Sequence, residues 1–214
     1  MNSVIIHLSD LHYRQGWVED HGVVLNSFFE DLSQQIKRKD DSNVYFAFSG
    51  DLVHAGAKPD IYKDFFIQFD SKLNDLNIPK SHRICVPGNH DVSADYIKEK
   101  LVDHEGVVSL GLNEHEFNEY ILKQPNVLTE KFPHYKEFEK SFAEFGAMGA
   151  TATGAGWEIS NDIGVYCLNT ALCASGGLEG KEGKKIVDKR RLAIDTRSLH
   201  NWNIKSKARL KILV

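Results

Sequence analysis

Three short clusters of residue types that bind metals follow one another in the first half of the chain. They are Asp10-Leu11-His12, Gly50-Asp51 and Gly88-Asn89-His90-Asp91. Carboxylate oxygens, amide oxygens and imidazole nitrogens all bind divalent cations in proteins. Taken singly, each cluster is equally consistent with a turn or a helix cap, because such short patterns occur by chance in many proteins. Their shared position, directly after a β-prone run, makes them a candidate metal site.

The segments around these clusters predict the elements that would position them. Residues 4–9, 43–49 and 83–86 are short apolar runs typical of buried strands. Residues 22–39 and 61–76 carry apolar side chains at three- and four-residue spacing, which predicts helices. Alternating strands and helices indicate an α/β domain with a largely parallel sheet, whose sites lie at the carboxyl ends of its strands. The three clusters are therefore expected at one edge of one sheet.

The residue types within the clusters suggest how cations would be held. Asp10 and His12 are two residues apart, so in an extended segment their side chains would point to the same side and hold one cation together. Asp51 has two carboxylate oxygens and can bridge two cations about 3.5 to 4 Å apart, the spacing at which a metal pair clamps a phosphate. Asn89 offers a neutral amide oxygen, which binds a second cation without adding charge.

In order and spacing, these clusters resemble the motifs of the calcineurin-like metallophosphoesterase family. The segments that carry the resemblance are Leu8-Ser9-Asp10-Leu11-His12, Phe48-Ser49-Gly50-Asp51-Leu52-Val53 and Val86-Pro87-Gly88-Asn89-His90-Asp91. They cover the first half of the family's domain, and they look most like the bacterial cyclic-nucleotide-phosphodiesterase-like branch. The resemblance implies a four-layer αββα sandwich. It also implies a metal-dependent hydrolase that cleaves a phosphodiester of the nucleotide or nucleic acid type.

The resemblance also assigns the metal ligands. Asp10 and His12 would hold the first metal, Asp51 would bridge, and Asn89 would hold the second. The family uses two divalent cations, with Mn favoured here over Fe, Zn, Mg and Co. The attacking group would be a hydroxide that bridges the two metals, because the cations lower its pKa toward neutrality.

Two histidines are expected to act on the substrate rather than on the metals. By the resemblance, His90 would protonate the leaving oxygen or stabilise charge, with Asp91 fixing its ring. His54, three residues after Asp51, would lie at the rim and could contact substrate, although a loop histidine without a role fits its position as well. His7, inside the first strand, is expected to be packed in the core.

The remainder of the chain departs from the regular alternation of strand and helix. Residues 92–156 are charged and mainly helical in pattern and end in a run of small residues at 146–156, which predicts a helical insertion or lid with a flexible end. A strand at 164–169, a helix at 188–202 and a strand at 209–214 follow. We expect a single domain that takes up the whole chain.

The later histidines of the family's motif are absent from this sequence. The family needs one histidine in a short cluster and a final Gly-His-x-His, whereas the histidines after His90 are His104, His115, His134 and His200, all outside strand ends. Because the strand-like run 210–214 stands where the family's next histidine should follow at once, we expect residues 1–214 to be a truncated domain, incomplete at the carboxyl end. We expect it to be nearly inactive alone, with a carboxyl-terminal domain or partner subunit completing the site.

Two other functions stay open on these residues. A phosphomonoesterase would share the metal site and differ only in the pocket around it. A non-catalytic regulatory or assembly module with an incomplete metal site is a further alternative, in which the metal would be a structural element.

The composition is that of an ordinary globular protein. Hydrophobic residues make up 42% and charged residues 26% of the 214 residues, which excludes a disordered or fibrous chain. The first residues carry no basic n-region and no long apolar run, and no later run reaches the roughly 18 to 20 apolar residues of a membrane span, so we expect neither secretion nor membrane insertion. The cysteines Cys85, Cys167 and Cys173 are odd in number and scattered, so we expect reduced, buried thiols in a cytoplasmic protein.

The formal net charge of -4 is unevenly distributed. Residues 181–214 hold 11 Lys and Arg against 3 Asp and Glu, which leaves 15 and 27 for the residues before them. A basic stretch beside a phosphate-handling site could attract nucleotides or nucleic acid, but a solvated helix face with a charged loop is the simpler explanation.

Overall fold

The structure is a computed structural model of the 214-residue chain. It describes residues 2–14, 20–38, 42–54, 56, 58–100, 109, 113–124, 126–144, 153–177 and 193–214.

The first sheet is parallel and has the strand order β1-β2-β3, with β1 at Asn2–Leu8, β2 at Ser42–Ser49 and β3 at Arg83–Val86. Helix α1 (Asp20–Lys37) connects β1 to β2, and α2 (Pro59–Asp75) connects β2 to β3. This confirms the strands and helices expected from the apolar patterns, with ends displaced by up to two residues. The start of α2 moves forward to Pro59, whose fixed φ suits the first turn of a helix.

The second sheet has the order β4-β5-β6 and contains one strand that the sequence did not predict. Strands β4 (Gly154–Glu158) and β5 (Ile163–Leu168) pair antiparallel, and β6 (Leu210–Leu213) pairs parallel to β5 after α8 (Thr196–Lys205). The small residues that begin β4 were expected to be a flexible loop. The glycine at 156 serves packing rather than flexibility, because a Cβ there would lie 2.1 Å from the indole of Trp202 on α8.

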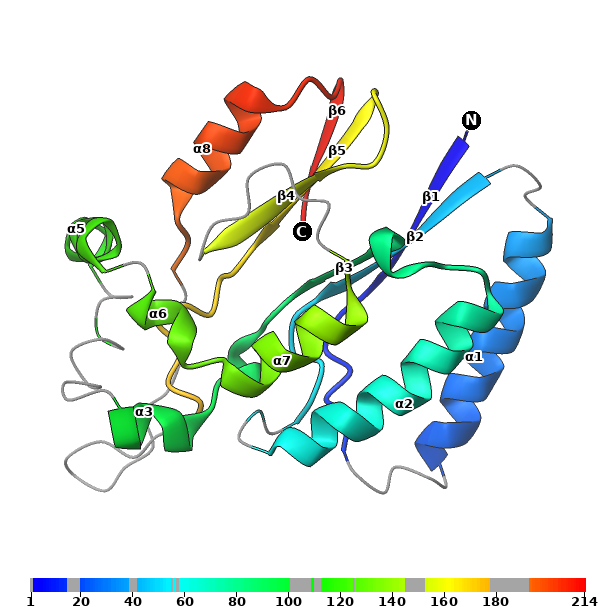
Figure 1. The fold of residues 1–214 in the computed structure, drawn as a ribbon, viewed down its shortest axis with the longest axis horizontal. Coiled ribbons are helices and arrows are strands. Elements are labelled where there is room, and N and C mark those ends of the chain that lie inside the picture. The colour runs from blue at the N-terminus through cyan, green and yellow to red at the C-terminus, as the bar shows by residue number, and fades with distance from the viewer. Residues whose placement is uncertain are drawn as a thin grey trace.

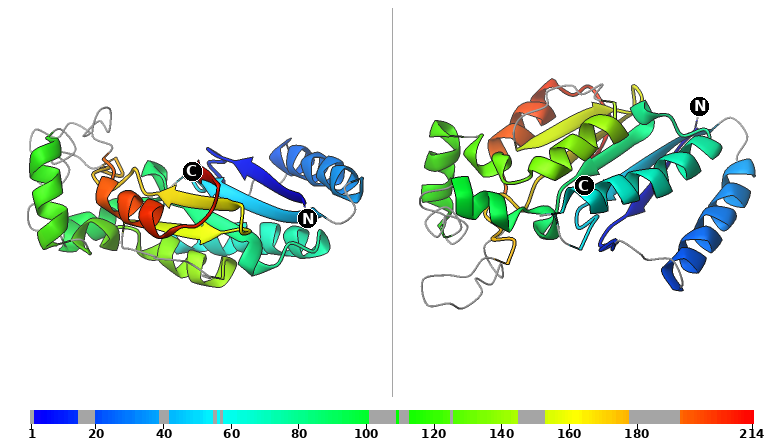
Figure 2. Two further views of the ribbon diagram at one scale, coloured as in Figure 1. Left: turned by 90° about the horizontal axis from the view of Figure 1, so that it is seen from above. Right: turned by 60° about the horizontal axis from the view of Figure 1, so that its bottom comes forward.

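The two sheets pack face to face and carry helices on their outer faces. On β2, Phe46 and Phe48 point toward the helices, where they join one core with side chains of α1, α2 and α7 (Pro133–Phe142). Tyr45 and Ala47 point the other way and pack against the second sheet. On the far face of that sheet, Trp202 of α8 packs against Tyr166 and Leu168. The layers are therefore helix, sheet, sheet, helix, as Figures 1 and 2 show, which confirms the expected αββα sandwich.

The segment expected to be an insertion contributes to this core. Besides α7 it contains α3 (Ala94–Lys100), α5 (Glu114–Lys123) and the short α6 (Val127–Glu130). Phe138 and Phe142 of α7 stack with each other and contact Phe65 of α2, so α7 belongs to the outer helix layer. A lid formed by the rest of this segment stays a prediction. Of its expected flexible end, residues 146–152 lie outside the described part and 154–156 lie in β4.

The cysteines are buried and free, as expected. His7 differs from expectation, because it is exposed on β1 and its ring lies 2.6 Å from the hydroxyl of Ser49 rather than in the core. None of the described helices is both long enough and apolar enough to cross a membrane.

Candidate metal centre

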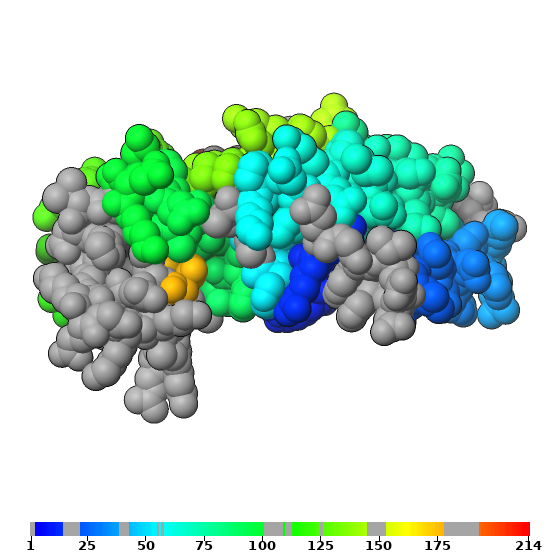
Figure 3. Space-filling model, turned by 90° about the horizontal axis from the view of Figure 1, so that it is seen from below, coloured from blue at the N-terminus to red at the C-terminus, as the bar shows by residue number. Residues whose placement is uncertain are grey.

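The segments after β1 and β2 run side by side beyond the carboxyl ends of the strands. The amides of Asp10, His12 and Tyr13 donate to the carbonyls of Gly50, Asp51 and Leu52, at 3.2, 2.9 and 2.9 Å. These bonds extend the pairing of the parallel strands past the sheet itself. Figure 3 shows this face of the molecule, with the segment after β1 in dark blue beside the segment after β2 in cyan. The first two sequence clusters therefore meet, as expected.

The backbone of these segments is left-handed at the residues that carry the functional side chains. Asp10, His12 and Asp51 have φ values of 54°, 46° and 51°, and Asn77 is the fourth residue other than glycine with positive φ in the described part. A left-handed residue other than glycine costs roughly 1 to 2 kcal/mol, and such strain gathers at functional sites. The expectation of an extended segment at residues 10–12 is therefore wrong. The two side chains still converge, because both residues take the same left-handed turn.

The loop after β3 reaches the site through two glycines. A Cβ on Gly88 would lie 2.2 Å from Oδ1 of Asp51, and a Cβ on Gly50 would lie 3.0 Å from the Cα of Gly88. Only a residue without a side chain fits at Gly88, so the two loops touch directly. The amide of His90 then donates to Oδ1 of Asp51 at 2.9 Å, which orients that carboxylate. All three sequence clusters thus join in one place.

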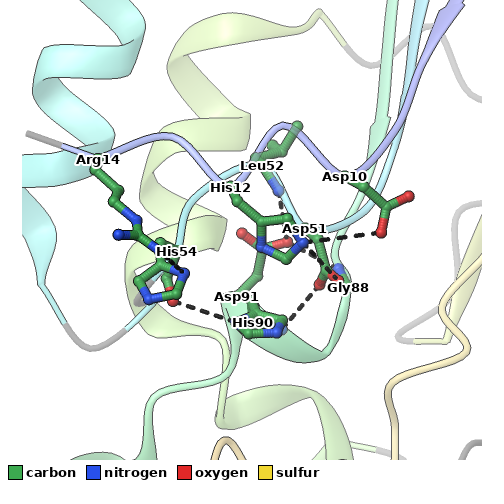
Figure 4. A network of polar contacts seen from close by, with 9 residues as sticks. All are labelled: Asp10, His12, Arg14, Asp51, Leu52, His54, Gly88, His90 and Asp91. Carbon is green, nitrogen blue, oxygen red and sulfur yellow. Dashed lines mark hydrogen bonds and ion pairs between the residues drawn. The ribbon is translucent and has the colours of Figure 1, made fainter. Parts of the chain in front are cut away.

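The donor atoms form two groups that share His12. In one group His12 joins Asp10 and Asp51, in the other it joins His54 and His90, and the donor atoms of each group lie within 4.8 Å of one another. Nε2 of His12 lies 3.9 Å from Oδ1 of Asp10 and 4.0 Å from Oδ2 of Asp51. Figure 4 shows the imidazole of His12 between the Asp10 carboxylate and the rings of the other two histidines.

This donor set suits divalent cations. It combines imidazole nitrogens with carboxylate oxygens, a mixture that Mn, Fe, Zn and Co accept. The Nδ1 atom of His12 is buried and makes no hydrogen bond to any described residue. A buried nitrogen without a partner costs free energy, so stability alone does not explain the position of this ring, whose other nitrogen, Nε2, faces the two carboxylates.

His54 and Arg14 form the rim of the cluster. Nη2 of Arg14 lies 3.4 Å from Nδ1 of His54, and the ring of His54 stacks on that of His90 with centroids 5.7 Å apart. The pKa of His54 is lowered below its usual range, chiefly because the ring loses contact with water and secondly because the positive charge of Arg14 lies close to it. Near neutral pH this ring is therefore uncharged and has a lone pair to offer.

Asp91 does not hold the ring of His90, contrary to expectation. The short 3-10 turn η2 (Asn89–Asp91) directs its carboxylate inward, where it accepts from the hydroxyl of Tyr62 at 2.7 Å and from the amides of Gly88 and Leu52 at 2.8 and 3.4 Å. Burial raises its pKa to about 6, although the bonds from Gly88 and Tyr62 act in the opposite direction. Asp91 thus connects both loops to α2, while Nδ1 of His90 lies 3.2 Å from the carbonyl of His54.

The other predicted residues fall into three groups. Asn89 opens the turn that carries His90, and its role as a ligand stays a prediction. His115, His134 and His200 join no metal-binding group in the described part of the chain, and His104 lies outside that part. Two further residues of the site, Arg14 and Tyr62, were not expected from the sequence. Arg14 could have been found from its place two residues after His12, whereas no pattern marks Tyr62.

Comparison with known proteins gives two matches. The model of the family described as calcineurin-like phosphoesterase matches residues 3–205. Over 99 residues the chain is 25% identical to the uncharacterized metallophosphoesterase-like protein YydB of Bacillus subtilis (strain 168). That alignment covers 46% of this chain and 19% of YydB, so the chain matches about a fifth of the length of this curated relative. No solved structure matches.

Proposed function

Since this chain belongs to the calcineurin-like phosphoesterase family, we propose that it serves the hydrolysis of phosphodiesters of the nucleotide or nucleic acid type. The observation that carries the proposal is the meeting of Asp10, His12 and Asp51 with His54 and His90, on backbone that is strained at the first three. A fold retains such strain where a function requires the geometry.

Two divalent cations are the proposed cofactors. The residues that would hold them are Asp10, His12, Asp51 and Asn89. When bound, such cations polarise a phosphate and lower the pKa of a coordinated water. The chain itself orients the Asp51 carboxylate that would bind them, because the amide of His90 fixes its Oδ1 and Gly88 lets the two loops touch.

The proposed proton donor is His90. Its Nδ1 lies 3.2 Å from the carbonyl of His54, so a proton on Nδ1 would be held there and Nε2 would face the substrate. Proton transfer to a leaving oxygen by a positioned side chain is worth about a hundred- to ten-thousand-fold in rate. Asp91 acts through the loops as a positioning residue, since its bonds go to Gly88, Leu52 and Tyr62.

A diester is favoured over a monoester by the charges at the rim. A diester carries one negative charge, whereas a monoester dianion calls for fixed positive charges beyond those that the cations would supply. Among the described residues in contact with the histidines, Arg14 is the one with a fixed positive charge. His54, with its lowered pKa, adds a neutral hydrogen-bonding group.

Two measurements test this function in the full-length protein that contains this chain: the amount of metal bound and the rate of hydrolysis. Asp51→Asn should remove the metals and the activity, whereas His90→Ala should keep the metals and lower turnover by at least a hundredfold. His115→Ala is the matched control, because its side chain is exposed on α5 away from the cluster. Loss of metal in His90→Ala would contradict the division between ligand and acid.

The ester class has its own assay. An aryl phosphodiester should be hydrolysed at least as fast as the matching aryl monoester. A clear preference for the monoester would move the function to a phosphatase. A protein that binds no metal at all with Asp10, His12 and Asp51 intact would point instead to a regulatory or assembly module.

A further inference from the structure

A cavity of about 410 Å³ lies beside the metal cluster and is not used by the mechanism above. It borders the carboxyl ends of β3 and β5 and the amino end of β4, and α6 and α7 cover it. Figure 1 shows these two helices next to the strand ends. Its size falls within the roughly 300 to 1,000 Å³ of ordinary ligand pockets. The residues that line it are Cys85, Val86, Pro87, Asn126, Thr129, Phe132, Tyr135, Lys136, Glu139, Gly154, Ala155, Cys167 and Asn169.

The cavity wall reaches to within one residue of the metal cluster. Pro87 lines the cavity, and the next residue, Gly88, is the one whose Cβ would collide with the Asp51 carboxylate. Consecutive Cα atoms are about 3.8 Å apart. The cavity wall at Pro87 is therefore one residue from the metal cluster, and a sugar is long enough to join a ligand at this wall to a phosphate at the cluster.

Glu139 gives the cavity an acceptor with spare capacity. Its Oε1 accepts from the hydroxyl of Tyr135 at 3.2 Å, and no other described side chain or amide donates to this carboxylate. Burial raises the pKa of Glu139 to about 7, against the opposing effects of Tyr135, Lys136 and Lys140. A carboxylate so poorly solvated has much to gain from a ligand that brings N–H donors.

Donors lie on the same wall. Nζ of Lys136 donates to the hydroxyl of Thr129 at 3.2 Å, and burial lowers the pKa of Lys136. The side-chain oxygen of Asn169 accepts from the amide of Ala171 at 2.9 Å, which leaves the amide nitrogen of Asn169 to donate. Apart from Asn126, the rest of the lining is apolar or carries thiols, including Val86, Phe132 and Ala155. An apolar cavity that also contains a hydrogen-bond acceptor and hydrogen-bond donors suits a flat ring whose edge carries both N–H groups and acceptor atoms.

We propose that this cavity binds the nucleobase of the diester whose phosphate lies at the metal cluster, with Glu139 accepting from the N–H groups of the base. This inference rests on the function proposed above. Guanine is the best match in chemistry, because two adjacent N–H donors face a carboxylate well and its carbonyl oxygen can accept from Lys136. Adenine and the pyrimidines offer a carboxylate fewer adjacent donors.

Binding of guanosine, which has no phosphate, tests the cavity without any turnover. The wild-type protein should bind guanosine more tightly than adenosine or thymidine, and Glu139→Gln should weaken guanosine binding about tenfold. Glu137→Gln is the matched control, because Glu137 lies on the same helix but lines a different groove, between α2 and α7. Titration calorimetry measures all three proteins.

The second arm uses two diesters with the same leaving group, guanosine 5′-(p-nitrophenyl) phosphate and methyl p-nitrophenyl phosphate. Glu139→Gln should raise the ratio of the first KM to the second about tenfold, and Glu137→Gln should leave that ratio unchanged. Guanosine binding that is absent, or is equal in wild type and Glu139→Gln, overturns the inference and marks the cavity as a hydrated void. An unchanged KM ratio overturns it too. Guanosine binding that depends on Glu139, together with no hydrolysis of either diester, supports the cavity's ligand and overturns the proposed function instead.

Discussion

Polar groups lie at both ends of β3, with Arg83 at its start and the metal cluster beyond its end. The two differ in how many of their polar atoms have hydrogen-bond partners within the chain. The Arg83 side chain is fully buried and donates to Asp70 and Asn74 at 2.6 Å each and to the carbonyls of Ile78 and Phe142. Its guanidinium also lies over the ring of Phe142, 5.1 Å from the centroid. It therefore links β3 to α2 and α7 with every nitrogen bonded.

The metal cluster is built in the opposite way. Nδ1 of His12 is buried without a partner in the described part, Asp10 is 68% exposed, and three of the residues carry left-handed strain. Polar groups that serve stability are usually satisfied within the fold, whereas groups that serve binding are left for a partner to satisfy. The difference indicates that β3 is anchored at one end so that the loop at its other end, which contacts the strained Asp51 through Gly88 and His90, keeps its geometry.

The largest expected effect is at Arg83, the fully hydrogen-bonded residue at the start of β3. Arg83→Met removes the guanidinium from Asp70, Asn74 and two carbonyls, which leaves buried acceptors without donors. We expect the free energy of unfolding to fall by about 3 to 5 kcal/mol. Urea denaturation measures it, with Lys63→Met, at an exposed side chain of α2, as the control. A loss below about 1 kcal/mol would show that Arg83 does not anchor the strand.

A pH effect at Glu139 lies between the two extremes, since this half-buried carboxylate accepts a hydrogen bond from one described donor, Tyr135. Because the folded state raises its pKa from 4.5 to about 7, the folded protein binds this proton more tightly than the unfolded chain. Stability should therefore fall as pH rises from about 4.5 to about 7, by roughly 3 kcal/mol at most. Glu139→Gln should lack this contribution and keep only the smaller fall that the raised pKa of Asp91 adds below about pH 6. Unfolding midpoints of both proteins across that range decide it, and parallel curves would contradict the prediction.

The smallest expected effect is at the metal cluster, where a substitution should raise the free energy of unfolding instead of lowering it. With metal chelated, Asp51→Asn removes a negative charge near Asp91, whose pKa is raised mainly by burial and in smaller part by the charge of Asp51. An amide oxygen can still accept from the amide of His90. We expect the metal-free variant to be as stable as wild type or up to about 1 kcal/mol more stable. Denaturation in the presence of a chelator measures this, and a clear loss of stability would make Asp51 a structural residue.

Much of the fold was predictable because its information is local. The apolar runs of the strands and the three- and four-residue spacing in α1 and α2 each report burial within a few residues of themselves. Strand β4 was missed because the reason for its small residues lies in a distant helix. Gly156 is small to admit Trp202, and no local pattern contains that contact.

The sequence by itself determined which residues meet at the site, because parallel strands joined by helices bring their carboxyl ends together whatever the details. Tertiary structure alone decided how those residues are held. The left-handed turns at Asp10 and His12 depend on the pairing of two loops, and the inward direction of Asp91 depends on Tyr62 from α2. Both rest on contacts between segments far apart in the chain, and residue types and spacing carry no record of such contacts.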